Sequence, residues 1–174
     1  MVHPYNSVNA FNLWALRGTM WVPDSQYILG LPQYLWGLVF VTTAIALVVF
    51  RYVTARTHAA LLEACAVASL AFFILPTRMH ERYLFNGLLF TIACIPCARR
   101  YLAGAIALSI ILLANLLYSL QYLHAVAGGA PSVNGQNLWG LWTTVFSLTA
   151  VGTFFMLGYE FWAAKGPPDK ALAR

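Results

Sequence analysis

The chain has 174 residues, of which 61% are hydrophobic and only 9% are charged. Soluble domains carry about 25% charged residues, so this composition excludes a soluble domain and predicts a membrane protein. The net charge is +5, but the basic residues are too few and too scattered to form a nucleic-acid-binding surface. We therefore expect membrane lipid, and no nucleic acid, as a partner.

Residues 1–32 precede the first hydrophobic stretch and form a polar and aromatic segment. This segment has no basic region followed by an apolar region, so it is not expected to be a signal peptide. We expect it to lie outside the membrane.

Five hydrophobic stretches follow within residues 33–162, and each is predicted to be a membrane-spanning helix. A hydrocarbon core of about 30 Å needs about 20 apolar residues in a helix to cross it. The third stretch is short and contains Pro96. The predicted fold is therefore all-α, a polytopic transmembrane bundle of about five spans. The spans are expected at residues 33–50, 59–75, 83–98, 101–123 and 139–159.

The basic residues predict the orientation of the bundle, with the N-terminus outside and the C-terminus inside. In this orientation seven arginines and lysines lie on the cytoplasmic side and three lie outside, as the positive-inside rule requires. Residues 163–174 are then a short cytoplasmic tail. The inner residues are Arg51, Arg56, Arg99, Arg100, Lys165, Lys170 and Arg174, and the outer ones are Arg17, Arg78 and Arg82.

The segment after the second span concentrates ionisable residues: Arg78, His80, Glu81 and Arg82 lie within five positions. The planar guanidinium group of arginine suits phosphate or carboxylate, and histidine or glutamate can accept a proton from a hydroxyl or orient it. One interpretation is a site for a lipid phosphate at the outer surface. The other is an interfacial loop in which the arginines contact lipid head groups and Glu81 pairs with one of them.

Two segments of the chain resemble a known family. The run Pro76–Leu84, which reads PTRMHERYL, resembles a signature in the C-terminal part of bacterial multi-spanning mannosyltransferases of the GT-C superfamily. The opening run His3–Leu16, which reads HPYNSVNAFNLWAL, resembles a second segment of the same proteins. The two runs occur in the order and spacing expected for that family.

The resemblance implies a glycosyltransferase of the bacterial cytoplasmic membrane. Such an enzyme moves a sugar, expected to be mannose, from a polyprenyl-phosphate donor to an acceptor on the outer face. The two arginines would hold the donor phosphate, the histidine and glutamate would shape the site, and the asparagines and tryptophan would line the same outer cavity. No cofactor and no metal-ligand set is evident. The implied donor-site residues are Arg78, His80, Glu81, Arg82, Asn9, Asn12 and Trp14.

The chain departs from the family where the catalytic base is expected. Family members carry an acidic base in the first large outer loop of their N-terminal half, and the predicted outer segments here hold only Asp24 and Glu81. The base is thus expected outside this chain. The chain would then be the C-terminal part of a larger transferase, inactive alone, with the missing N-terminal part as a partner.

Two alternatives remain open at this point. One is a small transporter or channel subunit, which would need ionisable groups or broken helices near the middle of the membrane. The predicted spans offer only Glu63 and Pro96, both toward the cytoplasmic side. The other is a non-catalytic remnant that assembles with another chain. Glu63 and Glu160 lie close enough to span ends to reach water or to pair with a loop arginine.

Overall fold

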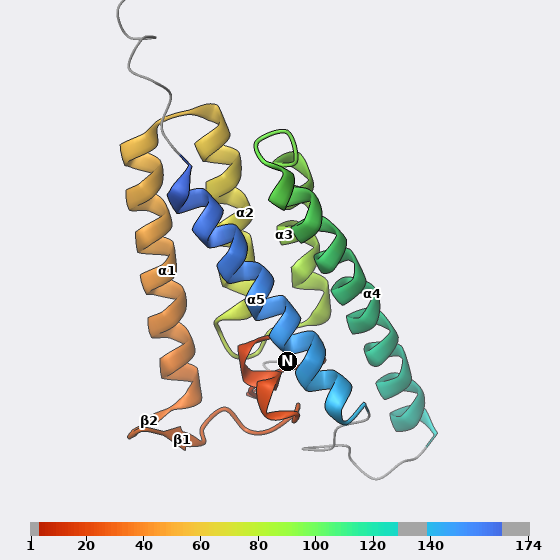
Figure 1. Cartoon of the computed structure of the whole chain (residues 1–174). Coiled ribbons are helices and arrows are strands. Elements are labelled where there is room, and N and C mark those ends of the chain that lie inside the picture. The colour runs from red at the N-terminus through yellow and green to blue at the C-terminus, as the bar shows by residue number, and fades with distance from the viewer. Residues whose placement is uncertain (1–3, 129–138, 165–174) are drawn as a thin grey trace, which may run out of the picture.

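The computed structural model describes residues 4–128 and 139–164, and it confirms the all-α class predicted from the sequence. Five α-helices form an elongated bundle, with a small irregular layer at one end (Figure 1). His3 and the predicted cytoplasmic tail from Lys165 onward lie outside the described residues. The helices are α1 (Gln33–Ala55), α2 (His58–Ile74), α3 (Leu84–Ala93), α4 (Arg99–Ala127) and α5 (Leu141–Ala163).

Three of these helices, α1, α4 and α5, are long and apolar enough to cross a membrane, which indicates a membrane protein. The helix α2 has 17 residues and is shorter, with a length of about 26 Å at a rise of 1.5 Å per residue. The helix α3 has only 10 residues, or about 15 Å at the same rise. The third span was predicted at residues 83–98, but α3 ends at Ala93, before Pro96.

Local sequence explains where the first two helices end. Arg56 adopts a left-handed conformation with φ of 49° and terminates α1. The Thr57 side chain then accepts a hydrogen bond from the Ala60 N–H at 3.0 Å and caps the start of α2. The helix α2 ends at Ile74. The next residue, Leu75, still has helical backbone angles and donates its N–H to the Ala71 carbonyl, but Pro76 has no N–H with which to continue the helix.

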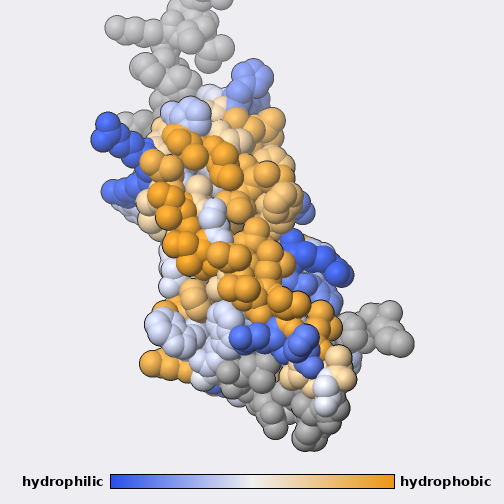
Figure 2. Space-filling model, turned by 90° about the vertical axis from the view of Figure 1, so that its right-hand side faces the viewer, coloured by the Kyte–Doolittle hydropathy of each residue, from blue (hydrophilic) through white to orange (hydrophobic). Residues whose placement is uncertain are grey.

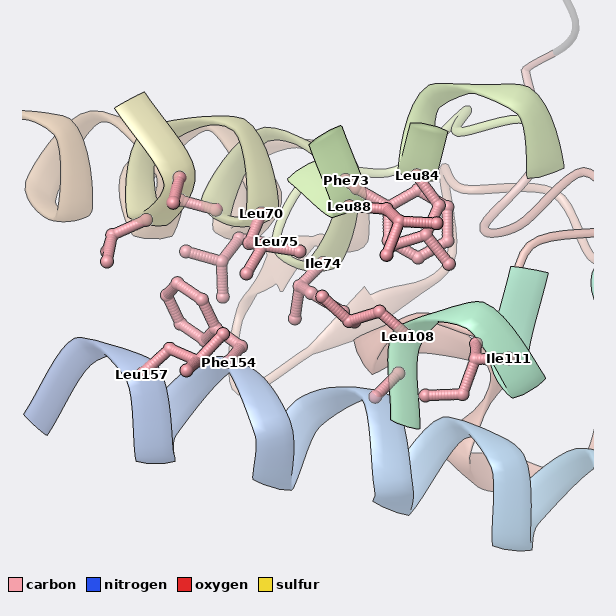
Figure 3. Packing of buried hydrophobic residues seen from close by; sticks show 14 of the residues in the cluster. Leu70, Phe73, Ile74, Leu75, Leu84, Leu88, Leu108, Ile111, Phe154 and Leu157 are labelled. Carbon is pink, nitrogen blue, oxygen red and sulfur yellow. The ribbon is translucent and has the colours of Figure 1, made fainter. Parts of the chain in front are cut away.

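The helix α2 lies at the centre of the bundle and packs against α1, α3 and α5. Figure 3 shows its apolar side chains meeting those of α3, α4 and α5 in one contiguous core. In lipid such a core is held by close van der Waals packing rather than by exclusion of water. The labelled core residues are Leu70, Phe73, Ile74, Leu75, Leu84, Leu88, Leu108, Ile111, Phe154 and Leu157.

The irregular layer lies at the end of the bundle that carries the turn between α2 and α3, and we call this the outer end, following the predicted orientation (Figure 1). Its short elements are η1 (Leu13–Arg17), β1 (Tyr27–Ile28) and β2 (Leu31–Pro32), while η2 (Glu81–Tyr83) precedes α3. The layer reaches into the bundle: Phe11 is fully buried and stacks on Phe146 of α5 with ring centroids 5.3 Å apart. The first segment is thus packed against helices and is not a free outer loop.

The lipid-facing surface is clearest on α4. Figure 2 shows this side of the molecule, where hydrophobic residues form a band along the face and hydrophilic residues lie at its edges and toward its ends. The exposed apolar residues of α4 recur every three or four positions, so they form one stripe along the helix. They are Leu102, Ile106, Ile110, Leu113, Leu116, Leu117, Leu120, Leu123 and Val126.

The predicted orientation can be tested by cysteine labelling in a background in which Cys65, Cys94 and Cys97 are replaced by alanine. An impermeant thiol reagent added to intact cells should modify Ser25→Cys, because Ser25 is exposed in the outer layer. It should not modify Thr54→Cys, which is exposed at the opposite end of α1. Labelling of Thr54→Cys with protection of Ser25→Cys would reverse the orientation.

Candidate functional site

The two segments for which the sequence analysis predicts a resemblance to the transferase family lie side by side at the outer end. The Val8 N–H donates to the Met79 carbonyl at 3.0 Å, and the Arg78 N–H donates to the Tyr5 carbonyl at 3.0 Å. Val8 and His80 form an isolated parallel bridge. The indole N–H of Trp14 donates to the Leu75 carbonyl at 2.8 Å, across 61 positions of sequence. Backbone pairing therefore joins segments that the sequence separates by an entire helical hairpin.

Asp24 fixes this junction. Its carboxylate, on a side chain that is 2% exposed, accepts hydrogen bonds from Arg78 Nε at 2.6 Å and Nη2 at 3.3 Å and from Thr77 Oγ1 at 3.0 Å. Its backbone N–H donates to the Pro4 carbonyl at 3.1 Å, and its carbonyl accepts from the Tyr34 N–H at 3.2 Å. We call Asp24, Thr77 and Arg78 the Asp24 clamp. The clamp ties the N-terminal segment to α1 and to the turn after α2.

Arg78 is held in an unusual conformation by this clamp. Its φ is 65°, a left-handed geometry that costs a residue other than glycine about 1–2 kcal/mol. The guanidinium lies over the Tyr34 ring, 5.8 Å from its centroid. The hydrogen bond with Asp24 raises the pKa of Arg78, while partial burial acts in the opposite direction. Two of the three guanidinium nitrogens donate hydrogen bonds to Asp24, so only one remains for another anion.

A glycine lets α1 approach the clamp closely. A Cβ atom at Gly37 would lie 3.0 Å from Pro76 Cα and 3.0 Å from Thr77 N, closer than the surrounding backbone allows. The absence of a side chain therefore brings the start of α1 against the turn, where Tyr34 covers Arg78.

The other predicted residues of this segment, His80, Glu81 and Arg82, lie at the start of η2 or within it. His80 is half-buried and meets Tyr83 edge-on, with ring centroids 5.8 Å apart. Arg82 is exposed, and its guanidinium lies 5.5 Å from the Tyr83 ring centroid. Within residues 4–128 and 139–164, Arg78 pairs with Asp24, and no ion pair is found for Glu81 or Arg82. In the described residues, Arg82 is thus the arginine of this segment whose guanidinium does not pair with a carboxylate.

The predicted residues of the first segment are buried and hold the layer together. Asn9 Oδ1 accepts a hydrogen bond from the Trp21 indole at 2.8 Å. Asn12 Oδ1 accepts from the backbone N–H groups of Trp14 and Ala15 and caps η1. Of the three, only Trp14 lines a hollow at the outer end. Their role in sugar binding stays a prediction.

Sequence reasoning missed two polar residues that organise the outer end. Asp24 looked like an isolated loop acid, although it anchors the clamp. Asn115 is fully buried on α4, and its Oδ1 accepts from the Phe11 N–H at 2.9 Å across 104 positions. An amide in the middle of a hydrophobic span was the available signal, because intramembrane polar groups need a partner.

The other end of the bundle carries its own polar contacts. Glu160 pairs with Arg100, the second residue of α4. Pairing with an arginine was one of the two expectations for this acid, although Arg100 lies in a helix and not in a loop. The Arg51 Nε–H donates to the Phe161 carbonyl at 3.2 Å and links the ends of α1 and α5. Glu63 is buried in α2 near this end.

Neither a metal centre nor a known relative identifies the site. In the described part of the chain, no group of three or more His, Cys, Asp or Glu residues could hold a metal ion. Comparison with protein-family models, with curated proteins and with solved structures finds no match for this chain.

Removing either partner of the Asp24–Arg78 pair should lower the stability of the protein, but by different amounts. Arg78→Ala leaves the Asp24 carboxylate buried with only Thr77 as a partner. Breaking a fully buried pair costs about 3–5 kcal/mol, and we expect about 2 kcal/mol here because the Arg78 side chain is 40% exposed. Asp24→Asn should lower the free energy of unfolding by less than Arg78→Ala does, because the freed Arg78 guanidinium can be solvated by water. Thermal unfolding of the purified protein in detergent measures both changes.

Arg82→Ala is the matched control, because Arg82 lies in the same turn and is exposed. It should change the free energy of unfolding by no more than about 0.5 kcal/mol. If Arg78→Ala and Arg82→Ala lowered the unfolding temperature equally little, the clamp would not stabilise the outer end.

Proposed function

We propose that this chain forms the donor-binding end of a membrane glycosyltransferase. The enzyme would move a sugar, expected to be mannose, from a polyprenyl-phosphate donor to an acceptor on the outer face of the bacterial cytoplasmic membrane. The observation that carries the proposal is the pairing of the two motif segments. Residues 5–8 and 78–80, recognised independently in the sequence, are joined by backbone hydrogen bonds at one end of the bundle.

Arg82 is the residue that we assign to the donor phosphate. It is exposed on η2, next to the outer ends of α2 and α3, where a lipid head group lies while its chain stays in the hydrocarbon. Its guanidinium can form charge-assisted hydrogen bonds to phosphate oxygens. The same bonds would stabilise the charge that develops on the departing lipid phosphate as the sugar bond breaks.

Arg78 acts in this proposal as a positioning residue. Its hydrogen bonds to Asp24 and its backbone bond to Tyr5 fix the turn from which η2 begins. His80 and Glu81 lie between the two arginines and would shape the site toward the sugar.

The chain does not offer a convincing catalytic base. Transfer to a hydroxyl requires a group that takes its proton. The Asp24 carboxylate is buried and already accepts bonds from Arg78 and Thr77, which leaves Glu81 as the other acid of the outer end. The resemblance puts the base in an N-terminal outer loop, so we place it on another part of the enzyme rather than on Glu81.

Donor binding by the chain alone tests this proposal. The purified chain in lipid nanodiscs should bind polyprenyl-phosphate-mannose, and Arg82→Ala should weaken binding about tenfold, because a hydrogen bond to a charged group contributes about 1.5–3 kcal/mol. The donor affinity of Arg82→Lys should lie between those of the wild type and Arg82→Ala, because lysine keeps the charge but not the planar guanidinium group. The control is Arg99→Ala, an exposed arginine at the opposite end. Equal donor affinity in all four proteins would remove Arg82 from the donor site.

The position of the base makes a separate prediction. The purified chain, supplied with polyprenyl-phosphate-mannose and candidate acceptors, should release no glycosylated product. Turnover that disappears in Glu81→Gln would show instead that Glu81 is the base and that the chain is sufficient for transfer.

A further inference from the structure

A long apolar groove runs between α1 and α5 and has α2 as its floor. Its volume is 890 Å³. Figure 1 shows that α1 and α5 converge toward one end of the bundle and diverge toward the outer end, where η1 lies between them. We call this the α1–α5 groove. Its lining includes Leu13, Phe40, Ala44, Val48, Phe154 and Trp162.

A smaller hollow of 330 Å³ continues the groove at the outer end. The two share Leu13 and Phe40 in their linings, so they adjoin each other. We call the smaller part the outer hollow. Its lining includes a charged side chain and a buried amide, Arg17 and Gln33, together with Trp14 and Trp36.

Two side chains that line the outer hollow indicate that it binds a ligand. Gln33 is only 2% exposed, and its Oε1 has no hydrogen-bond partner within the described residues. A buried carbonyl oxygen of this kind needs a donor. Arg17 is exposed, and no carboxylate pairs with it in residues 4–128 and 139–164. The hollow thus offers a cation and an unsatisfied acceptor beside an apolar groove.

We propose that the α1–α5 groove and the outer hollow bind one anionic glycerophospholipid whose head group carries hydroxyls, of the phosphatidylglycerol type. Its acyl chain would lie in the groove, its phosphate would meet Arg17, and a head-group hydroxyl would donate to Gln33 Oε1. None of the residues lining either depression belongs to the Asp24 clamp or to η2. Trp14 is the one predicted donor-site residue that lines the outer hollow. The lipid site is otherwise distinct from the clamp and from η2, and it does not depend on the proposed function.

The dimensions and the chemistry favour this ligand. From Gln33 to Val48 the two adjoining depressions extend over about 22 Å of α1 at a rise of 1.5 Å per residue. This exceeds half of a hydrocarbon core of about 30 Å, so the bound chain lies extended along the helix. Phosphatidylcholine has no hydroxyl donor and no net charge, and a polyprenyl phosphate without sugar has no hydroxyl-rich head. A phosphate with attached hydroxyls supplies an anion for Arg17 and a hydrogen-bond donor for Gln33.

Native mass spectrometry of the purified protein tests the proposal. The protein is equilibrated in detergent with equal amounts of phosphatidylglycerol and phosphatidylcholine, and one phosphatidylglycerol should be retained with at least tenfold preference. Arg17→Gln and Gln33→Leu should each reduce this preference severalfold. Ala44→Phe, which fills the groove, should abolish retention. Ala46→Phe is the matched control, because Ala46 is an exposed residue of α1 outside the groove, and it should behave like the wild type.

Three results would overturn the assignment. Equal retention of the two phospholipids would mean that the groove holds only bulk lipid. Unchanged retention in Ala44→Phe would place the lipid elsewhere. Displacement of phosphatidylglycerol by an equal amount of polyprenyl phosphate would assign the groove to an isoprenoid lipid instead.

Discussion

The Asp24 carboxylate is the constraint on which the outer end depends. A carboxylate with 2% exposure is costly to bury unless it is paired and hydrogen-bonded. Arg78 and Thr77 supply that pairing, and they can do so only if the turn after α2 comes back against the first segment. The same residue fixes the start of α1 through the Tyr34 N–H. One buried charge therefore determines how three parts of the chain meet.

That junction explains how irregular backbone can lie at the end of a transmembrane bundle. Non-helical backbone is tolerated near the hydrocarbon only where protein groups satisfy it. Here Met79 and Tyr5 carbonyls accept from the facing segment, and the Asn115 side chain accepts from the Phe11 N–H. The layer thus has protein partners for these backbone groups. It also presents η2 on a rigid support, which is what a binding site for a lipid head group requires.

Hydrophobic stretches predicted the helices well, because length and apolar content alone decide whether a segment can cross lipid. The ends of α1, α4 and α5 extend past the predicted spans, and the short α3 reflects Pro96, whose presence the sequence did show. The site was less predictable. The segment around Arg78 was found from its density of charge, but Asp24, its true partner, lies 54 positions away. Single-sequence patterns carry little information about such pairings, since they depend on tertiary packing.

Hydrogen–deuterium exchange at the Val8 and Arg78 amides is the most direct measure of this account. Both N–H groups donate across the junction, to Met79 and Tyr5, so both should exchange slowly in the wild-type protein in detergent. Asp24→Asn should speed exchange at the two amides together, while amides in the middle of α4 stay protected. Fast exchange at Val8 and Arg78 in the wild type, or no effect of Asp24→Asn, would contradict the view that Asp24 holds the two segments together.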